Sequence, residues 1–224
     1  MATQSRTTLV SAERLPGWAE RFAAAHGALR CDQHDDGLHL SAADGSTALL
    51  HAPWPAAGRP GRGATELQRL ASLAAQSRTV AVVLIRSGGY ALGLCRDGEV
   101  LVSKAGSGFS QSRSGAGGSS QQRSARRRVN QADAMLERVA EYAQLLFRPQ
   151  PPGTGTDITN IGIAEYLVLG GDRALTSLLM AEPRAAFLAR LPQLRFLDVP
   201  DPKAAVLKTA AREVQAIRIR VTDS

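Results

Sequence analysis

The most regular hydrophobic pattern of the chain lies near its middle. Residues 79–86 form a nearly continuous apolar run, which is typical of a buried central strand. Gly88-Gly89 and Asp97-Gly98 then set off two shorter apolar segments, 90–96 and 99–104. Both dipeptides favour tight hairpin turns. The pattern therefore predicts three antiparallel strands in a meander.

Further elements follow from hydrophobic spacing toward the C-terminus. The pattern predicts a helix over residues 130–147, a buried strand over 164–172, a helix over 173–182, a helix over 202–214 and an alternating last strand over 216–221. This order of elements predicts an α/β fold (α+β with one mixed sheet) with helices on both faces. Three antiparallel strands continued by α and β elements are the ribonuclease-H-like arrangement.

The N-terminal residues predict a smaller region with the element order αββα. A helix is expected over 15–27, two strands over 38–52 joined at Asp44-Gly45, and a Pro- and Gly-rich connection over 53–63. Thr65 and Gln68 have the spacing of a capping box and open a helix over 65–77. We therefore expect an N-terminal αββ extension, residues 1–63, packed on a main domain of residues 64–224.

The distribution of charge adds information about function, because the basic residues are concentrated in one segment. The net charge is +7, and no Asp or Glu occurs between Glu99 and Asp133. The cations of this segment are Lys104, Arg113, Arg123, Arg126, Arg127 and Arg128. Together with many Gly, Ser and Gln residues, they predict a flexible basic loop over 104–128. A basic excess confined to one segment favours a nucleic-acid partner over a general solubility device.

The cysteine content and the lack of long apolar stretches indicate the cellular compartment of the protein. Cys31 and Cys95 are far apart and without metal-ligand or disulfide-framework spacing, which favours a reducing environment. No apolar stretch reaches about eighteen residues, and the N-terminal residues lack the pattern of a secretory signal. The sequence predicts a soluble, cytoplasmic protein without membrane contact.

Standard catalytic motifs find little support. The strand over 79–86 carries no carboxylate, and Glu165 and Asp172 flank the later strand without a partner cluster, which disfavours a two-metal nuclease. The segment His34–His39, "HDDGLH", is interpreted as a polar turn rather than a metal site. Walker A and Ser-His-Asp patterns are also lacking. No metal or cofactor is predicted.

A family resemblance rests on the basic segment and its surroundings. "GFSQ", Gly108–Gln111, follows the meander and precedes "RRRVNQADAM", in which Arg127, Arg128 and Asn130 match a family pattern. These features, with "GGDR" at Gly170–Arg173, resemble the release-factor domain of the Vms-type proteins of ribosome quality control. That domain is similar to the catalytic middle domain of eukaryotic and archaeal class-1 release factors. The chain, over Val80–Val221, resembles a stand-alone bacterial, actinobacterial member.

The resemblance implies a metal-independent peptidyl-tRNA hydrolase. Such a factor hydrolyses the ester between nascent chain and tRNA on stalled large ribosomal subunits, and a monomer is expected. Gln111 would position the water, and Gly108 would allow the backbone geometry that this needs. The six cations named above would contact ribosomal RNA.

The sequence leaves alternatives open. Gly117–Gln121 supplies a second Gly-x-x-Gln, so Gln121 competes with Gln111, which we prefer because it lies close behind its strand. Val129 and Gln131 replace the Tyr and Glu usual in the family. A non-catalytic RNA- or ribosome-binding module, cleavage within the tRNA 3′ end, and a mere linker between two halves remain the competing interpretations.

Overall fold

The chain folds into two compact units. The computed structural model describes residues 5–108, 119–148 and 163–224, and for residues 119–129 it describes the backbone alone. The N-terminal unit comprises Met1–Ser77 and Glu213–Ser224, and the central unit comprises Arg78–Arg212. This division differs from the boundary expected after residue 63, because the helix over 65–77 and the last strand both belong to the N-terminal unit.

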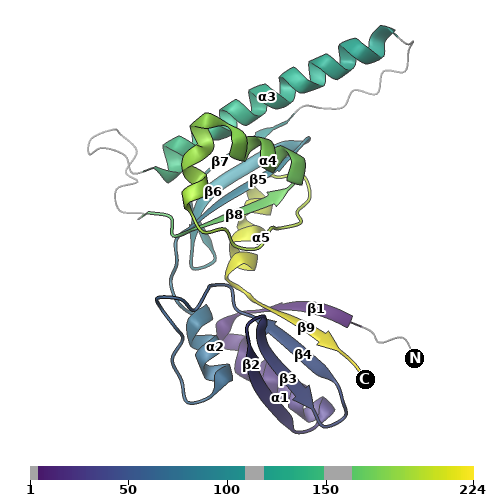
Figure 1. The fold of residues 1–224 in the computed structure, drawn as a ribbon, viewed down its shortest axis with the longest axis vertical. Helices are drawn as coiled ribbons and strands as arrows, with labels where there is room; N and C mark the ends of the chain where they lie inside the picture. Colours follow the sequence, from purple (N-terminus) through teal and green to yellow (C-terminus); the bar gives the residue numbers. More distant parts are fainter. Residues whose placement is uncertain (1–4, 109–118, 149–162) are drawn as a thin grey trace. The chain divides into compact units, whose positions relative to one another are not determined.

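The central unit contains a four-stranded mixed sheet (Figure 1). Its strand order is β7 (Glu99–Ser107), β6 (Gly89–Arg96), β5 (Val80–Arg86) and β8 (Tyr166–Gly171). The first three are antiparallel neighbours, whereas β8 runs parallel to β5. The predicted meander and the mixed α/β fold are therefore confirmed. The closer likeness to ribonuclease H stays a prediction.

Helices cover both faces of this sheet, as expected. On one face, α3 (Ser119–Phe147), α4 (Arg173–Ala181) and the 3-10 helix η2 (Pro183–Arg190) contribute to a core with alternate residues of the strands. On the other face, Leu207 of α5 (Ala204–Gln215) lies against Gly93 of β6, where an added Cβ would be 3.2 Å from the Leu207 Cδ2 atom. The sheet is thus a buried layer with one exposed edge strand, β7.

The last strand is where the sequence prediction was wrong. β9 (Ile217–Thr222) alternates as expected but pairs with β1 and β4, not with the central sheet. The N-terminal unit is a five-stranded antiparallel sheet in the order β1, β9, β4, β3, β2. Its other strands are β1 (Ser5–Val10), β2 (Leu29–His34), β3 (Gly37–Ala42) and β4 (Thr47–His51). Alternation specifies a strand and its faces, but the choice of partner depends on tertiary contacts.

The helices of the N-terminal unit pack on one side of its sheet. They are the short 3-10 helix η1 (Ala12–Arg14), α1 (Leu15–His26) and α2 (Glu66–Ala74). Leu15 and Phe22 of α1 and Leu70 of α2 are buried against Leu40 and Ile219 of the strands. This contact holds two chain segments together that are far apart in sequence.

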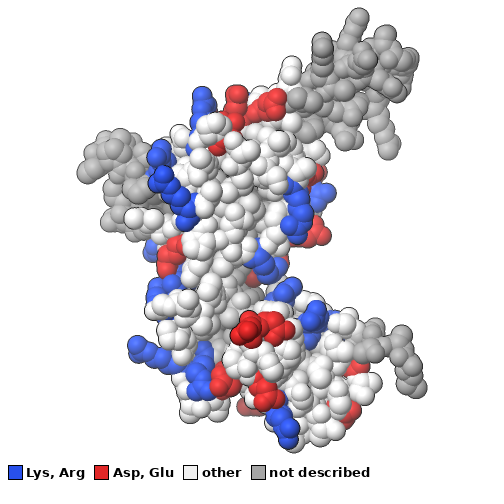
Figure 2. Space-filling view, in the orientation of Figure 1, with Lys and Arg blue, Asp and Glu red and all other residues white. Residues whose placement is uncertain are grey.

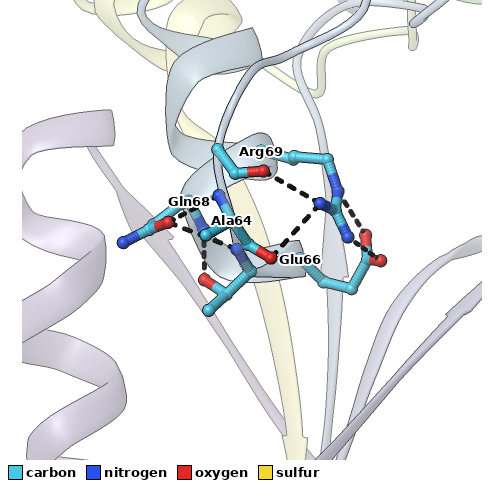
Figure 3. A network of polar contacts seen from close by, with 6 residues as sticks. Ala64, Glu66, Gln68 and Arg69 are labelled. Atoms are coloured by element: carbon cyan, nitrogen blue, oxygen red, sulfur yellow. Dashed lines mark hydrogen bonds and ion pairs between the residues drawn. The ribbon is translucent and has the colours of Figure 1, made fainter.

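The predicted capping box at the start of α2 is confirmed (Figure 3). The Thr65 hydroxyl accepts a hydrogen bond from the Gln68 amide at 3.2 Å, and the Gln68 side-chain oxygen accepts from the amides of Ala64 and Thr65 at 2.8 and 3.2 Å. Arg69 pairs with Glu66 and donates to the carbonyl of Ala64. These contacts satisfy amides that the first helical turn leaves without intrahelical partners.

In the part of the chain that the structure describes, no helix combines the length and the apolar character needed to cross a membrane.

Candidate functional site

The segment with the Gly-x-x-Gln motif leaves the central sheet at a fixed point. Gly108 follows the end of β7, and its amide donates to the carbonyl oxygen of Gly88, in the turn between β5 and β6, at 3.0 Å. A Cβ on Gly108 would overlap the Ser87 carbonyl oxygen and lie 2.7 Å from the Gly89 nitrogen. Only glycine fits this approach, because real Cβ atoms do not come so close to backbone atoms.

A second glycine of β7 is packed against an aromatic ring. A Cβ on Gly106 would lie 2.6 Å from the Tyr90 Cζ atom, so the tyrosine occupies the space beside the strand. Burial raises the pKa of Tyr90, while a hydrogen bond with Arg138 of α3 acts in the opposite direction. The Tyr90 ring is 6.2 Å from that of Tyr142, also on α3. The end of β7 is therefore held between the meander and the helix that follows the motif.

The predicted RNA contact Lys104 belongs to this anchor. It lies on exposed β7 and not in a loop, and its Nζ atom is 5.7 Å from the centre of the Tyr142 ring. A cation over an aromatic face is attracted by the ring quadrupole, yet an exposed ammonium still has free directions for a phosphate oxygen. Lys104 is thus well placed at the base of the segment.

The carboxyl ends of β5, β7 and β8 meet at the edge of the sheet from which the segment leaves. In open α/β sheets, ligands commonly bind at this edge. The Arg86 guanidinium donates to the Val199 carbonyl at 3.0 Å and lies 3.8 Å from Asp201. The Asp201 carboxylate packs on Gly88, where an added Cβ would lie 2.8 Å from its Oδ1 atom. This cluster supports the turn between β5 and β6, and Gly88 in that turn holds Gly108.

The "GGDR" sequence forms the neighbouring corner of the same edge. Gly171 has a φ of 93°, which favours glycine, and the Asp172 amide donates to the Ile85 carbonyl at 2.7 Å. The Asp172 carboxylate caps α4 by accepting from the Ala174 and Leu175 amides. The Arg173 guanidinium lies 4.2 Å from the centre of the Phe196 ring. Asp172 therefore has a structural role at the start of α4.

The segment over 104–128, predicted as a flexible loop, contains regular secondary structure at both of its ends. β7 continues to Ser107, and α3 begins at Ser119, eleven residues before the predicted start at 130. Positions Gln121, Arg123, Arg126, Arg127 and Arg128 are thus helical, although their side chains lie outside the described part of the structure. Gln111 and Arg113 fall outside the described residues altogether. Gln, Arg and Ala favour helices even without an apolar stripe, which explains why α3 begins earlier than predicted.

The first part of α3 extends beyond the buried core. Its buried residues are Met135, Leu136, Val139, Ala140, Ala143, Leu146 and Phe147. The 29-residue helix is about 43 Å long, and the figure shows it projecting past the sheet (Figure 1). Elsewhere, Lys and Arg side chains alternate with Asp and Glu over the visible face (Figure 2). In the sequence, residues 104–128 contain six Lys and Arg residues and no Asp or Glu, so most of the basic excess of the chain lies in this segment.

The other polar features have structural explanations. Glu165 pairs with the buried Arg78 at 2.8 Å and accepts from the Thr79 amide at 3.2 Å. At the β2–β3 turn, the His39 Nε2 atom is 2.7 Å from the Asp36 carboxylate, which lowers the pKa of that carboxyl. Among the described residues, no group of three or more His, Cys, Asp or Glu side chains could hold a metal ion. The close contacts of Gly88 and Gly106 were not predicted from the sequence, where the only signal for them is the presence of glycines within or beside strands.

A comparison with models of known protein families shows to which family the chain belongs. The family model described as "Actinobacteria/chloroflexi VLRF1 release factor" matches residues 78–220, nearly two thirds of the chain. The chain belongs to this release-factor family. The match begins where the central unit begins and includes α5 and most of β9. No curated protein matches the chain.

Membership in the VLRF1 release factor family confirms the resemblance derived from "GFSQ" and its surroundings. It also places the edge formed by Gly88, Gly108 and Asp172 inside the family region. Residues 1–77 lie outside that region, so the family match does not cover β1–β4, α1 and α2.

Proposed function

We propose that this protein is a ribosome-rescue factor that hydrolyses peptidyl-tRNA on stalled large ribosomal subunits. The observation that carries the proposal is the fixed exit of the Gly-x-x-Gln segment at Gly108, within a chain of the VLRF1 release factor family. A segment that must reach a distant ester needs a rigid base on its own domain. Gly88, in the turn between β5 and β6, and Gly106, on β7, supply that base.

The reaction is the attack of water on the ester carbonyl that joins the nascent chain to the terminal tRNA ribose. The products are a peptide carboxylate and the free ribose hydroxyl. A glutamine amide both donates and accepts hydrogen bonds, so Gln111 can orient the water and the reacting carbonyl without acting as a strong base. Positioning of this kind contributes several kcal/mol to catalysis.

Gln111 is a better candidate than Gln121 for this role. Gln121 is the third residue of α3, whereas Gln111 lies between the anchored Gly108 and the helix. A residue within a regular helix moves only with the whole helix. We propose that Gln111 takes its catalytic conformation when it binds in the ribosomal site.

The projecting helix supports an RNA partner. Positions 123, 126 and 127 share one side of a helix, because residues three and four apart are neighbours on its surface. We assign phosphate contacts to Arg123, Arg126 and Arg127, with Arg128, Arg113 and Lys104 as further contacts. The partners would be ribosomal RNA and peptidyl-tRNA in the cytoplasm, and the factor would act as a monomer.

The basic helix also favours a second candidate function, a non-catalytic RNA- or ribosome-binding module. Such a module would use the arginines of α3 and would not need Gln111. Single-turnover peptide release from purified large subunits separates the two functions. Release by the wild type that Gln111→Ala abolishes supports the hydrolase, and ribosome binding without release supports the module. Mapping the tRNA 3′ end afterwards distinguishes ester hydrolysis from cleavage within the tRNA.

A further inference from the structure

The sheet of the N-terminal unit has one face that its own helices leave open. Among the described residues, the core of this unit joins alternate strand residues, such as Leu40 and Ile219, to α1 and α2. Figure 1 shows α1 behind these strands. Because successive side chains of a strand point to opposite faces, the intervening residues form the other face. We call it the outer face, and its basic and imidazole side chains are Arg30, His34, His39, His51, Arg218 and Arg220.

Strand pairing brings these side chains into rows across the sheet. Arg218 of β9 lies opposite His51 of β4. In the next row, Leu49 lies between Arg220 of β9 and His39 of β3. Neighbouring strands are about 4.8 Å apart, so each row forms a nearly continuous surface. Leu49 is only 8% exposed although it belongs to the outer face. Flanking arginine stems can cover an apolar residue in this way while the charged ends stay in water.

The outer face carries a net positive charge. Three of its residues are arginines, its strands contribute the carboxylate of Asp32, which lies opposite His39, and the Asp36 carboxylate of the adjoining turn pairs with His39. Arg30 and Arg220 are exposed, and within the described part of the chain neither makes an ion pair. Burial first, and then the positive charges of Arg218 and Arg220, lower the pKa of His51, while Asp36 acts in the opposite direction. The charges of the outer face therefore act on the His51 imidazole.

Planar rings accompany the charges. The rings of His34 and His39 are 4.6 Å apart in an edge-on arrangement, and His34 is exposed. Hydroxyl groups of Ser41 and Thr47 lie beside each other on the same face. Arginines and hydroxyls are the usual phosphate ligands, and imidazole rings stack on unpaired bases. An open sheet that combines both is a suitable platform for a single strand, whose bases are free to stack.

We propose that the outer face of the N-terminal sheet binds single-stranded RNA, with Arg30 and Arg220 contacting phosphates and His34 contacting a base. The proposal goes beyond peptide release, because it assigns a ligand to the N-terminal unit, whose strands β1–β4 lie outside the family match. It gives the protein a second RNA contact, separate from the basic helix α3. Binding to an anionic membrane or to an acidic protein would depend on the arginines but not on the imidazole rings.

The experiment compares two double variants of the full chain that remove the same charge. R30S/R220S changes the outer face, and R14S/R21S changes exposed arginines of η1 and α1 on the helix side of the same unit. The probe is a fluorescent, unstructured RNA of about 12 nucleotides. Its affinity is measured between about 50 and 200 mM salt. Thermal unfolding verifies that both variants fold.

The proposal predicts a loss confined to R30S/R220S. Its Kd should rise about tenfold at the lower salt concentration, and the slope of log K against log salt should fall by about 1.4, or 0.7 for each lost phosphate contact. His34→Ala should reduce the preference for single-stranded over duplex RNA without changing that slope. Equal affinities and slopes for the two double variants would overturn the proposal. So would an R30S/R220S defect seen with anionic vesicles but not with RNA. Since RNA affinity is the readout, the result is independent of whether the protein releases peptides.

Discussion

The amide nitrogen of Gly108 donates to the carbonyl oxygen of Gly88 at 3.0 Å, and this bond joins the start of the Gly-x-x-Gln segment to the turn between β5 and β6. The turn is itself held by Asp201, whose carboxylate packs on Gly88. The geometry therefore determines where the segment begins, whatever conformation it adopts in its partner. Several expectations follow from this anchor and from the units around it.

Gly108→Ala should slow peptide release by about 100-fold, because a displacement of the base by about 1 Å misplaces the Gln111 amide that we propose to be catalytic. The added methyl group would overlap the Ser87 carbonyl, at a cost of about 1–3 kcal/mol in the stability of the central unit. Gly17→Ala is the matched control. Its Cβ would meet only the Arg21 side chain, at 3.4 Å, and alanine favours the α1 helix. Normal release by Gly108→Ala would show that the anchor is unnecessary.

Glu165→Ala should destabilise the central unit by about 2 kcal/mol, because it leaves the Arg78 guanidinium buried without this carboxylate partner. The control is Glu141→Ala, which removes an equally short but exposed pair with Arg184 and should cost less than about 1 kcal/mol. Urea unfolding followed by circular dichroism measures the loss. Both tryptophans, Trp18 and Trp54, lie in the N-terminal unit, so their fluorescence transition should not move. If both substitutions lowered the free energy of unfolding by the same amount, the claim that burial makes the Arg78–Glu165 pair more important for stability would be contradicted.

Ala125→Pro should remove the first part of α3 and leave the central core intact. Proline lacks the amide hydrogen and clashes with the carbonyl four residues earlier. The buried residues of α3 begin only at Met135, so the unfolding midpoint should stay unchanged. Far-UV circular dichroism should show the loss of roughly two turns of helix, or about seven residues. Ala125→Leu is the control, because leucine favours helices. Unchanged ellipticity would mean that α3 starts near residue 130.

The stability contribution of Cys95 should depend on pH. Burial raises the pKa of its thiol from 9.0 to about 12. The folded state keeps this proton above pH 9, whereas the unfolded chain loses it, so the contribution is complete below pH 9 and decreases as the pH rises toward 12. The limiting slope is about 1.4 kcal/mol per pH unit. Urea unfolding of the wild type and of Cys95→Ala at pH 7, 9 and 10 isolates this effect. A difference that is constant with pH would contradict it.

Local patterns sufficed for the meander, the capping box and the buried strand β8, because each depends on neighbouring residues. The alternation of β9 predicted a strand, but its partners β1 and β4 come from the opposite end of the sequence. β1 escaped prediction because five of its six residues are exposed and mostly polar, as on an edge strand. The start of α3 was placed too late because residues 119–129 lack an apolar stripe. Their helix depends on intrinsic propensity alone.

The Gly-x-x-Gln segment shows the same contrast between what local sequence predicts and what depends on tertiary contacts. Its Gly-x-x-Gln motif and its basic residues were evident in the sequence, and the family match confirms the relationship. The reason for Gly108 was not evident, because a close approach to Ser87 and Gly89 is a property of the folded meander. The supporting contacts of Tyr90 and Asp201 likewise join residues that no short motif connects.

The most direct test of the central claim is single-turnover release of labelled peptide from large subunits that carry peptidyl-tRNA. Wild type, Gln111→Ala and Gln121→Ala are compared at saturating protein, with ribosome binding measured in parallel. We predict release with an intact tRNA 3′ end by the wild type and by Gln121→Ala, and loss of release but not of binding in Gln111→Ala. Undiminished release by Gln111→Ala, or binding without release by the wild type, would contradict the account.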